Sequence, residues 1–293
     1  MSTAMILAAG LGTRLRPLTD ELPKPMVPVG DAPIVVQIQR HLAAHGFEAA
    51  VMNTHHLANA FDEVVYPLPT ELSHETEILG TAGGIRQVIE RTGVRPSVVW
   101  NGDILGSIDL GELLDVHHRT DVDATWVIAP REGSAGNVGV DDEGFVVRVR
   151  SFKNGVEARS GDFLGIYALS DELMGSLPRA GCIVGDVLGP RLSTSQRRIA
   201  TLTYEGRWFD IGTPVQYLQA NLAWLEDRQL TSFFALESDR GRWPAHLSSV
   251  IVGAGASCDT SGPIERAVVW PGASVRGPLR DAIVTKRNVV QLR

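Results

Sequence analysis

The sequence predicts an α/β fold with a mixed, mainly parallel sheet, followed by a short C-terminal β-helix-like segment. Over residues 1–130, short apolar runs alternate with segments of helical periodicity. This alternation is typical of a parallel sheet with helices on both faces. After about residue 243, short β-type runs punctuated by glycine replace it, as in a solenoid with edges of roughly six residues. We therefore expect a catalytic domain over residues 1–242 and a β-helix-like segment over residues 243–293.

The elements of the first part follow from apolar runs and from start and stop signals. Residues 33–45 have helical spacing, with Asp31 as the expected cap and Gly46 as the stop. A second helix is expected to begin with Thr81 as its cap and to end at Gly93. Buried strands are predicted at residues 4–9, 49–53, 97–100, 124–129 and 163–169.

The later elements carry equally local signals. Residues 138–149 are expected to form a hairpin that turns at residues 141–144. Thr213 is placed to cap a helix whose first turn contains Pro214. Only two or three coils fit into the C-terminal segment, so its core needs a neighbouring surface. That makes the segment a candidate for contact between subunits, and a homodimer is possible.

Composition excludes several classes of protein. The chain has 293 residues, 44% hydrophobic and 21% charged, which is ordinary for a water-soluble globular protein. Its apolar runs are too short to span a membrane, and no basic residues precede the first one as in a signal peptide. A net charge of −7 argues against nucleic-acid binding. The two distant cysteines, Cys182 and Cys258, are typical of reduced thiols, so a cytoplasmic protein is expected.

A glycine-rich loop follows the first predicted strand. Gly10 and Gly12 let the backbone bend sharply and let its N–H groups approach phosphate oxygens. Arg14 and Lys24 add positive charge, so a polyanion is the natural ligand. The loop lacks the Gly-Lys-Ser/Thr ending of a P-loop, and Leu15 stands where a dinucleotide fingerprint has its third glycine. This absence counts against an NAD(P)-dependent oxidoreductase.

The whole pattern around this loop is far more specific than two glycines. It reads Leu-Ala-Ala-Gly-Leu-Gly-Thr-Arg-Leu-Arg-Pro-Leu-Thr over residues 7–19, then Pro-Lys-Pro over residues 23–25. It resembles the signature of the sugar nucleotidyltransferase family, whose members include mannose-1-phosphate guanylyltransferases and glucose-1-phosphate uridylyl-, thymidylyl- and adenylyltransferases. The resemblance implies a Rossmann-like nucleotidyltransferase domain, a left-handed C-terminal β-helix-like segment and Mg²⁺ as cofactor. It also implies a nucleoside triphosphate and a sugar 1-phosphate as substrates.

Further segments resemble the family in the same order, at residues 79–84, 100–103, 163–167 and 208–214. The resemblance implies catalytic contacts to phosphate from Arg14 and Lys24, and metal ligation by Asp103 and Asp210. It implies nucleotide binding by Leu7, Ala8, Ala9, Gly10, Gly12, Thr13, Glu77, Gly80 and Thr81. It implies sugar-phosphate binding by Gly83, Asn101, Gly102, Lys153 and Gly165. Lys153 departs from the family pattern, because Phe152 precedes it where members have a glutamate.

The chemistry of these residue types agrees with the resemblance. Asp103 and Asp210 each follow a predicted strand, and Mg²⁺ typically takes one or two carboxylates together with substrate phosphates. Either aspartate could instead be an ordinary turn residue. A sugar phosphate is already ionised near neutral pH, so its attack on a triphosphate needs no general base. The sequence also lacks the Gly-x-Ser-x-Gly elbow of serine hydrolases.

The nucleobase and the sugar are only weakly indicated. The run Leu-Gly-Thr-Ala-Gly-Gly over residues 79–84 resembles guanylyltransferases, and Glu77 could accept two hydrogen bonds from the edge of guanine. GTP is therefore favoured, with a mannose- or heptose-type sugar 1-phosphate. The alternative is a uridylyltransferase acting on N-acetylmuramate or glucose 1-phosphate. A catalytically silent, sugar-nucleotide-binding regulatory subunit is the alternative of another class.

Overall fold

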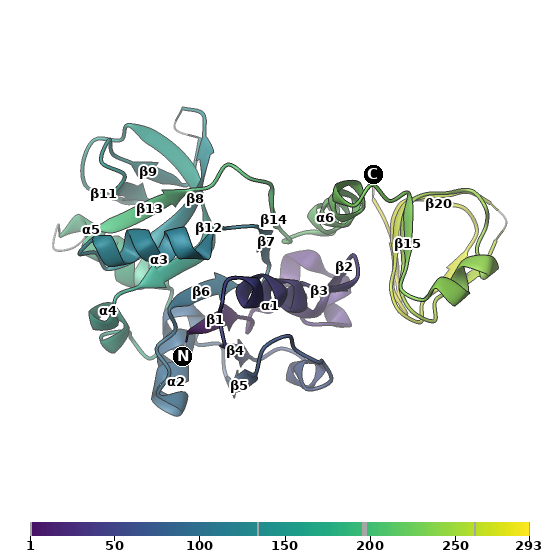
Figure 1. The fold of residues 1–293 in the computed structure, drawn as a ribbon, viewed down its shortest axis with the longest axis horizontal. Helices are drawn as coiled ribbons and strands as arrows, with labels where there is room; N and C mark the ends of the chain where they lie inside the picture. Colours follow the sequence, from purple (N-terminus) through teal and green to yellow (C-terminus); the bar gives the residue numbers. More distant parts are fainter. Residues whose placement is uncertain (1, 134, 195–197, 261, 293) are drawn as a thin grey trace. The chain divides into compact units, whose positions relative to one another are not determined.

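The structure is a computed structural model that describes residues 2–133, 135–194, 198–260 and 262–292 (Figure 1). The chain divides into two compact units that are interleaved along the sequence. The first comprises Met1–Gly10 and Ile38–Trp208, and the second comprises Leu11–Gln37 and Phe209–Arg293. The predicted division after residue 242 stays a prediction. No helix in the described part of the chain has the length and apolar character needed to cross a membrane.

The first unit is built on a mixed sheet in the order β11-β10-β9-β12-β6-β1-β4-β5, with β8 paired to β12 and β13 paired to β8. Strands β6, β1, β4 and β5 are parallel, whereas β12 runs antiparallel to β6, β8 and β9. The predicted α/β class with a mixed sheet is thereby confirmed. The strands of this sheet are β1 (Thr3–Leu7), β4 (Ala49–Thr54), β5 (Thr70–His74), β6 (Val98–Asn101), β8 (Ala124–Arg131), β9 (Val138–Val140), β10 (Val146–Val149), β11 (Phe152–Lys153), β12 (Arg159–Leu169) and β13 (Ile199–Thr203). Strand β7 (Ile104–Gly106) belongs to the same unit but not to this sheet.

Helices flank these strands and close the core. They are α1 (Ile34–Ala44, of which the part from Ile38 on belongs to this unit), η4 (Ala58–Phe61), α2 (Gly80–Thr92), α3 (Leu110–Arg119), α4 (Asp171–Gly175), η5 (Ile183–Leu188) and α5 (Gly189–Ser193). One apolar cluster joins side chains of strands β1, β4, β6, β8 and β12 to those of α2 and η5. Strand β1 lies between β6 and β4 and is parallel to both, so the carboxyl ends of these three strands lie side by side.

Two predicted helix caps are wrong, for different reasons. Asp31 lies in the turn between the paired strands β2 (Pro28–Val29) and β3 (Ala32–Pro33), so α1 begins three residues after it. Thr81 lies inside the first turn of α2, whose cap is Leu79, and its hydroxyl accepts a 2.7 Å hydrogen bond from Ile183 N–H. The predicted stop at Gly93 is confirmed, with a left-handed φ of 72°.

The second unit contains the N-terminal loop segment, helix α6 and the C-terminal coils. Thr213 caps α6 (Pro214–Asp227) by accepting from Gln216 N–H, as predicted. The remaining elements are η1 (Thr13–Leu15), η2 (Leu18–Asp20), η3 (Lys24–Met26), β14 (Trp208–Asp210), β15 (Ser232–Phe234), η6 (Glu237–Arg242), β16 (Leu247–Val252), β17 (Ser257–Asp259), β18 (Ile264–Val269), β19 (Ser274–Arg276), β20 (Leu279–Val284) and β21 (Val289–Gln291).

The C-terminal strands stack as a short parallel solenoid. Strands β15, β16, β18 and β20 form one parallel ladder, and β17 pairs with β19 in a second. Val250, Ala267 and Ala282 lie in register along the first ladder, and each is fully buried. This arrangement confirms a β-helix-like segment, while its left-handedness stays a prediction. Strand β21 pairs antiparallel with β20 and ends the ladder.

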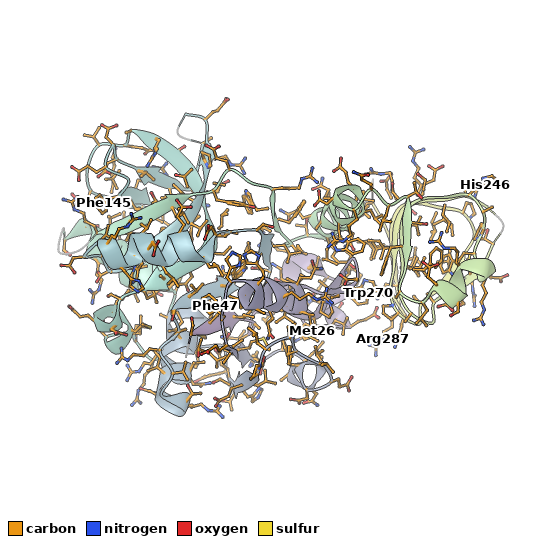
Figure 2. The ribbon with its side chains drawn as sticks, viewed as in Figure 1. Met26, Phe47, Phe145, His246, Trp270 and Arg287 are labelled. Carbon is orange, nitrogen blue, oxygen red and sulfur yellow. The ribbon has the colours of Figure 1, made fainter. Side chains whose placement is uncertain are left out.

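Tyr217 of α6 links three segments of the second unit. Its hydroxyl donates to Pro28 O at 2.6 Å and accepts from Trp270 Nε1 at 2.9 Å (Trp270 is labelled in Figure 2). Burial raises the pKa of Tyr217 far above its ordinary value, so the hydroxyl stays protonated and can donate. Asn221, one turn later, accepts from Gly30 N–H at 2.9 Å. Helix α6 therefore ties the N-terminal hairpin to the coils.

We expect Tyr217→Phe to lower the free energy of unfolding by about 2 kcal/mol, because it leaves a buried indole N–H without its acceptor. Urea denaturation measures the loss. Tyr66→Phe is the matched control, since Tyr66 donates to Phe61 O at 2.7 Å from a half-exposed position where water can replace it. Equal losses in the two variants would contradict the role given to Tyr217.

Candidate active site

The glycine-rich loop that is predicted to bind phosphate begins where β1 ends. Ala8 and Ala9 are buried, and the chain then becomes exposed at Gly10. An added Cβ at Gly10 would meet no atom within 4 Å, so the space beside this residue is open. At Gly12, in contrast, there is no space for a side chain. Its φ is +62°, and a Cβ there would lie 2.8 Å from Thr19 Cγ2 and 3.1 Å from Lys24 Cβ.

Three of the four residues predicted to contact the reacting phosphates or the metal lie within the second unit. Lys24 is only 9% exposed, and its ammonium lies 3.8 Å from Asp210 Oδ1. The exposed Arg14 lies against Gly212, where an added Cβ would be 3.2 Å from Arg14 Nη2. The group therefore contains two cations, Arg14 and Lys24, and one carboxylate, Asp210. Its excess of positive charge suits a phosphate-bearing ligand.

The predicted sugar-phosphate residues of β6 and β12 meet within the first unit. Leu7 O accepts a 2.9 Å hydrogen bond from Gly102 N–H, which joins the end of β1 to the turn after β6. The side chain of Asn101 lies over Gly165, and any Cβ at Gly165 would overlap it. Gly165 has φ +72°, so glycine is required there on both counts. Asp103 follows, half-buried, in the turn between β6 and β7.

The glycines at the start of α2 pack against the chain before η5. An added Cβ at Gly83 would lie 2.9 Å from Ala180 Cα, and Ala82 N–H donates to Gly181 O at 2.9 Å. Gly80 has φ +73° and would also collide with Gly181. Close packing therefore accounts for both glycines, and their roles toward a ligand stay predictions. Glu77 is exposed in the bend between β5 and α2.

Lys153, a predicted sugar-phosphate residue, lies several strands away from Asn101 in the sheet of the first unit, and its role stays a prediction. It is exposed on β11, an edge strand, where it pairs with Arg148 of β10. Strands β10, β9 and β12 separate β11 from β6 in the sheet order. At about 4.8 Å per strand, roughly 19 Å separate Lys153 from the strand of Asn101.

Two buried polar residues to which no motif pointed form hydrogen bonds with backbone groups of predicted site residues or their neighbours. Asn53, near the end of β4, accepts from Ala8 N–H at 2.9 Å and donates to Glu75 at 2.7 Å. Glu75 follows β5 and also accepts from Leu79 N–H at 3.0 Å. Their position in the sequence could have indicated them. Each is a polar residue at the carboxyl end of a strand, and ligands of open α/β sheets bind at these ends.

The donor set for a metal is small. No group of three or more His, Cys, Asp or Glu side chains arranged for a metal ion occurs among the described residues. Asp103 and Asp210 are carboxylates, and one or two of these with substrate phosphates is the usual set for Mg²⁺. The residues present therefore fit Mg²⁺ better than Zn²⁺, whose sites use three or four protein ligands.

Comparison with known proteins identifies the family of this chain. A family model described as nucleotidyl transferase matches residues 3–227. A mannose-1-phosphate guanylyltransferase of Mycobacterium tuberculosis is 29% identical over 93% of this chain and 80% of its own length. A UTP–glucose-1-phosphate uridylyltransferase of Synechocystis is 31% identical over 74% of this chain and 62% of its own length. A mannose-1-phosphate guanyltransferase of Yarrowia lipolytica is 29% identical over 75% of this chain and 63% of its own length.

Solved structures share the fold. The crystal structure of HddC from Yersinia pseudotuberculosis aligns with a TM-score of 0.61 at 22% identity, over 76% of this chain and all of HddC. A structure of HddC complexed with GMP-PN aligns with a TM-score of 0.62. At this level of identity the likeness concerns the fold alone.

We expect Gly12→Ala to lower the free energy of unfolding by about 2–4 kcal/mol, through the strained φ and the contacts with Thr19 and Lys24. Gly10→Ala should stay within about 0.5 kcal/mol of wild type, because its Cβ meets nothing and its φ is not positive. Thermal and urea unfolding measure both variants. A stable Gly12→Ala protein would show that the loop is not packed as described.

Proposed function

Because the chain belongs to the nucleotidyl transferase family, we propose that it transfers a nucleoside monophosphate from a nucleoside triphosphate to a sugar 1-phosphate and releases pyrophosphate. The observation that carries the proposal is the grouping of Arg14, Lys24 and Asp210 beside the glycine loop segment of the second unit. The names of the relatives support a sugar 1-phosphate as the acceptor.

The reaction is an in-line displacement at the α-phosphorus. An oxygen of the sugar phosphate forms a new bond to the α-phosphorus, while the bond from that phosphorus to the bridging oxygen of the β-phosphate breaks. The bonding electrons leave with pyrophosphate. The nucleophile is already ionised, since the second pKa of a phosphate monoester is about 6. The protein must therefore bring two anions together and stabilise the charge that develops on the leaving group.

Arg14 and Lys24 take different parts of this task. Arg14 is exposed and planar, which suits bidentate contact with the triphosphate and with the departing pyrophosphate. Lys24 is nearly buried and held beside Asp210, so its ammonium is a fixed point charge for the α-phosphate or the incoming phosphate. The open backbone of Gly10 admits phosphate oxygens to the N–H groups of the loop.

We propose Asp103 and Asp210 as the protein ligands of Mg²⁺. Two carboxylates together with substrate phosphates are a usual set of ligands for this ion. When bound, Mg²⁺ supplies positive charge that polarises the phosphates and favours release of pyrophosphate. Lys24 balances the charge of Asp210 in the ligand-free chain, because the two side chains are 3.8 Å apart.

We favour GTP as the donor and a mannose- or heptose-type sugar 1-phosphate as the acceptor. The guanylyltransferase names of several relatives support this choice. Glu77 is exposed and therefore accessible to the edge of a guanine. A uridylyltransferase is the second candidate, because the Synechocystis relative bears that name. The intact Lys24–Asp210 pair argues against a silent regulatory subunit, which would not require it.

We expect pyrophosphate release only when Mg²⁺, one triphosphate and one sugar 1-phosphate are all present. A coupled pyrophosphate assay over GTP, UTP, ATP and dTTP, each with mannose, heptose, glucose and N-acetylmuramate 1-phosphates, identifies the pair. GTP should give the highest kcat/KM, and EDTA should abolish turnover. No release with any combination would refute the proposed function, and a preference for UTP would establish the second candidate.

We expect Arg14→Ala and Asp103→Ala each to lower kcat/KM by at least about 10²–10³-fold, because each removes a charge that acts on the reacting phosphates. Circular dichroism should show an unchanged fold. Arg16→Ala is the control, since Arg16 pairs with Asp20 at 3.2 Å with its side chain 59% exposed. Near-wild-type activity in either test variant would remove that residue from the mechanism.

A further inference from the structure

The peptide group between Leu7 and Ala8 lies at the end of β1, and both its carbonyl oxygen and its N–H form hydrogen bonds. Its carbonyl oxygen accepts from Gly102 N–H at 2.9 Å. Its N–H donates to Asn53 Oδ1 at 2.9 Å. Because the peptide is planar, these two bonds fix its orientation and so set the direction in which residues 8–10 leave the strand.

A buried carboxylate in turn fixes the orientation of Asn53. Asn53 Nδ2 donates to Glu75 Oε1 at 2.7 Å, and Leu79 N–H donates to Glu75 Oε2 at 3.0 Å. Asn53 is 4% exposed and Glu75 is 1% exposed, so bulk water does not replace these bonds. A carboxylate only accepts hydrogen bonds, so it requires the amide nitrogen of Asn53 on its side. The amide oxygen is thereby directed at Ala8.

Helix α2 packs directly onto this pair. An added Cβ at Gly84 would lie 2.7 Å from Asn53 Nδ2 and 2.8 Å from Glu75 Oε1. Leu79, whose N–H the carboxylate binds, immediately precedes the helix that carries Gly80 and Thr81. One carboxylate therefore orients two backbone segments, the start of the loop and the start of α2.

We infer that Asn53 and Glu75 are positioning residues for nucleotide binding, and that the donor–acceptor order Ala8–Asn53–Glu75–Leu79 sets the affinity for the triphosphate. This inference rests on the proposed function, because it takes residues 8–10 and the start of α2 as parts of the nucleotide site. Neither residue needs to touch the nucleotide, since both act through backbone groups that they hold.

Isosteric exchange of the two side-chain types tests the order of the bonds. Asn53→Asp alone places two acceptors against each other. Glu75→Gln alone places two N–H groups against each other, at Asn53 or at Leu79. The double variant Asn53→Asp/Glu75→Gln restores all three bonds. Its carboxylate at position 53 accepts from Ala8 N–H and from the new amide at position 75, and the oxygen of that amide accepts from Leu79 N–H. The net charge of the double variant equals that of the wild type.

We expect each single variant to weaken triphosphate binding about tenfold or more, as for a buried hydrogen-bonding group left unsatisfied. The KM for the triphosphate should rise more than kcat falls. The double variant should return to within about threefold of wild type. Isothermal titration with Mg²⁺ and GTP or UTP measures affinity, and hydrogen exchange of the ligand-free full chain reports the Ala8 amide. This amide should exchange faster in the single variants and recover in the double variant.

Gln39→Leu separates positioning from general destabilisation. Gln39 is fully buried in the same unit, accepts from Leu68 N–H at 3.2 Å and donates to Thr70 at 3.0 Å. Its replacement should lower Tm without changing triphosphate affinity or the exchange of Ala8.

Three results would overturn the inference: wild-type affinity and exchange in the single variants, an equal loss of affinity in Gln39→Leu, or no recovery in the double variant. If the wild type binds and transfers no nucleotide, the proposed function fails. In that case the inference about nucleotide affinity fails with it, while the exchange data still report whether the pair holds the peptide.

Discussion

The second unit depends on how it accommodates a lysine that is almost out of contact with water. Burial of an unpaired ammonium costs several kcal/mol, so Lys24 needs a carboxylate, and Asp210 supplies it from almost two hundred residues away. The contact requires η3 and the end of β14 to lie together. Gly12 must stay small because its neighbours are Thr19 and Lys24 itself. Helix α6 then starts at a capped turn only three residues after Asp210, which fixes the position of that carboxylate.

Much of the fold could be predicted because its signals are local. Apolar runs and the Thr213 cap depend on neighbours in sequence, and the structure bears them out. Asp31 failed as a cap because a competing local structure, the hairpin of residues 28–33, places it in a turn. Thr81 failed because a tertiary contact prevailed, since its hydroxyl accepts from Ile183 N–H. Whether a residue can cap a helix depends on its neighbours in sequence, whereas a stronger partner is brought to it only by folding.

The candidate site shows the same difference between local signals and contacts that form only on folding. Residues in contiguous motifs, such as Arg14 and Asn101, could be proposed from the sequence because the motif itself is the signal, and their roles stay predictions. Asn53 and Glu75 were missed because their importance lies in two hydrogen bonds that exist only after β4, β5 and α2 have assembled. Lys153 was predicted from its place in the sequence, which gives no measure of its distance along the sheet from Asn101, and its role stays a prediction.

The reversal of β21 has a consequence for how this protein can associate. A parallel coil grows by presenting an unpaired edge to the next strand running the same way. Strand β21 covers the last such edge of the main ladder with a strand of opposite direction. A coil from a second molecule would meet a register and polarity that do not continue the stack. A parallel coil from a second molecule therefore cannot pair with β20, and the outer strand on this side of the ladder is the short strand β21.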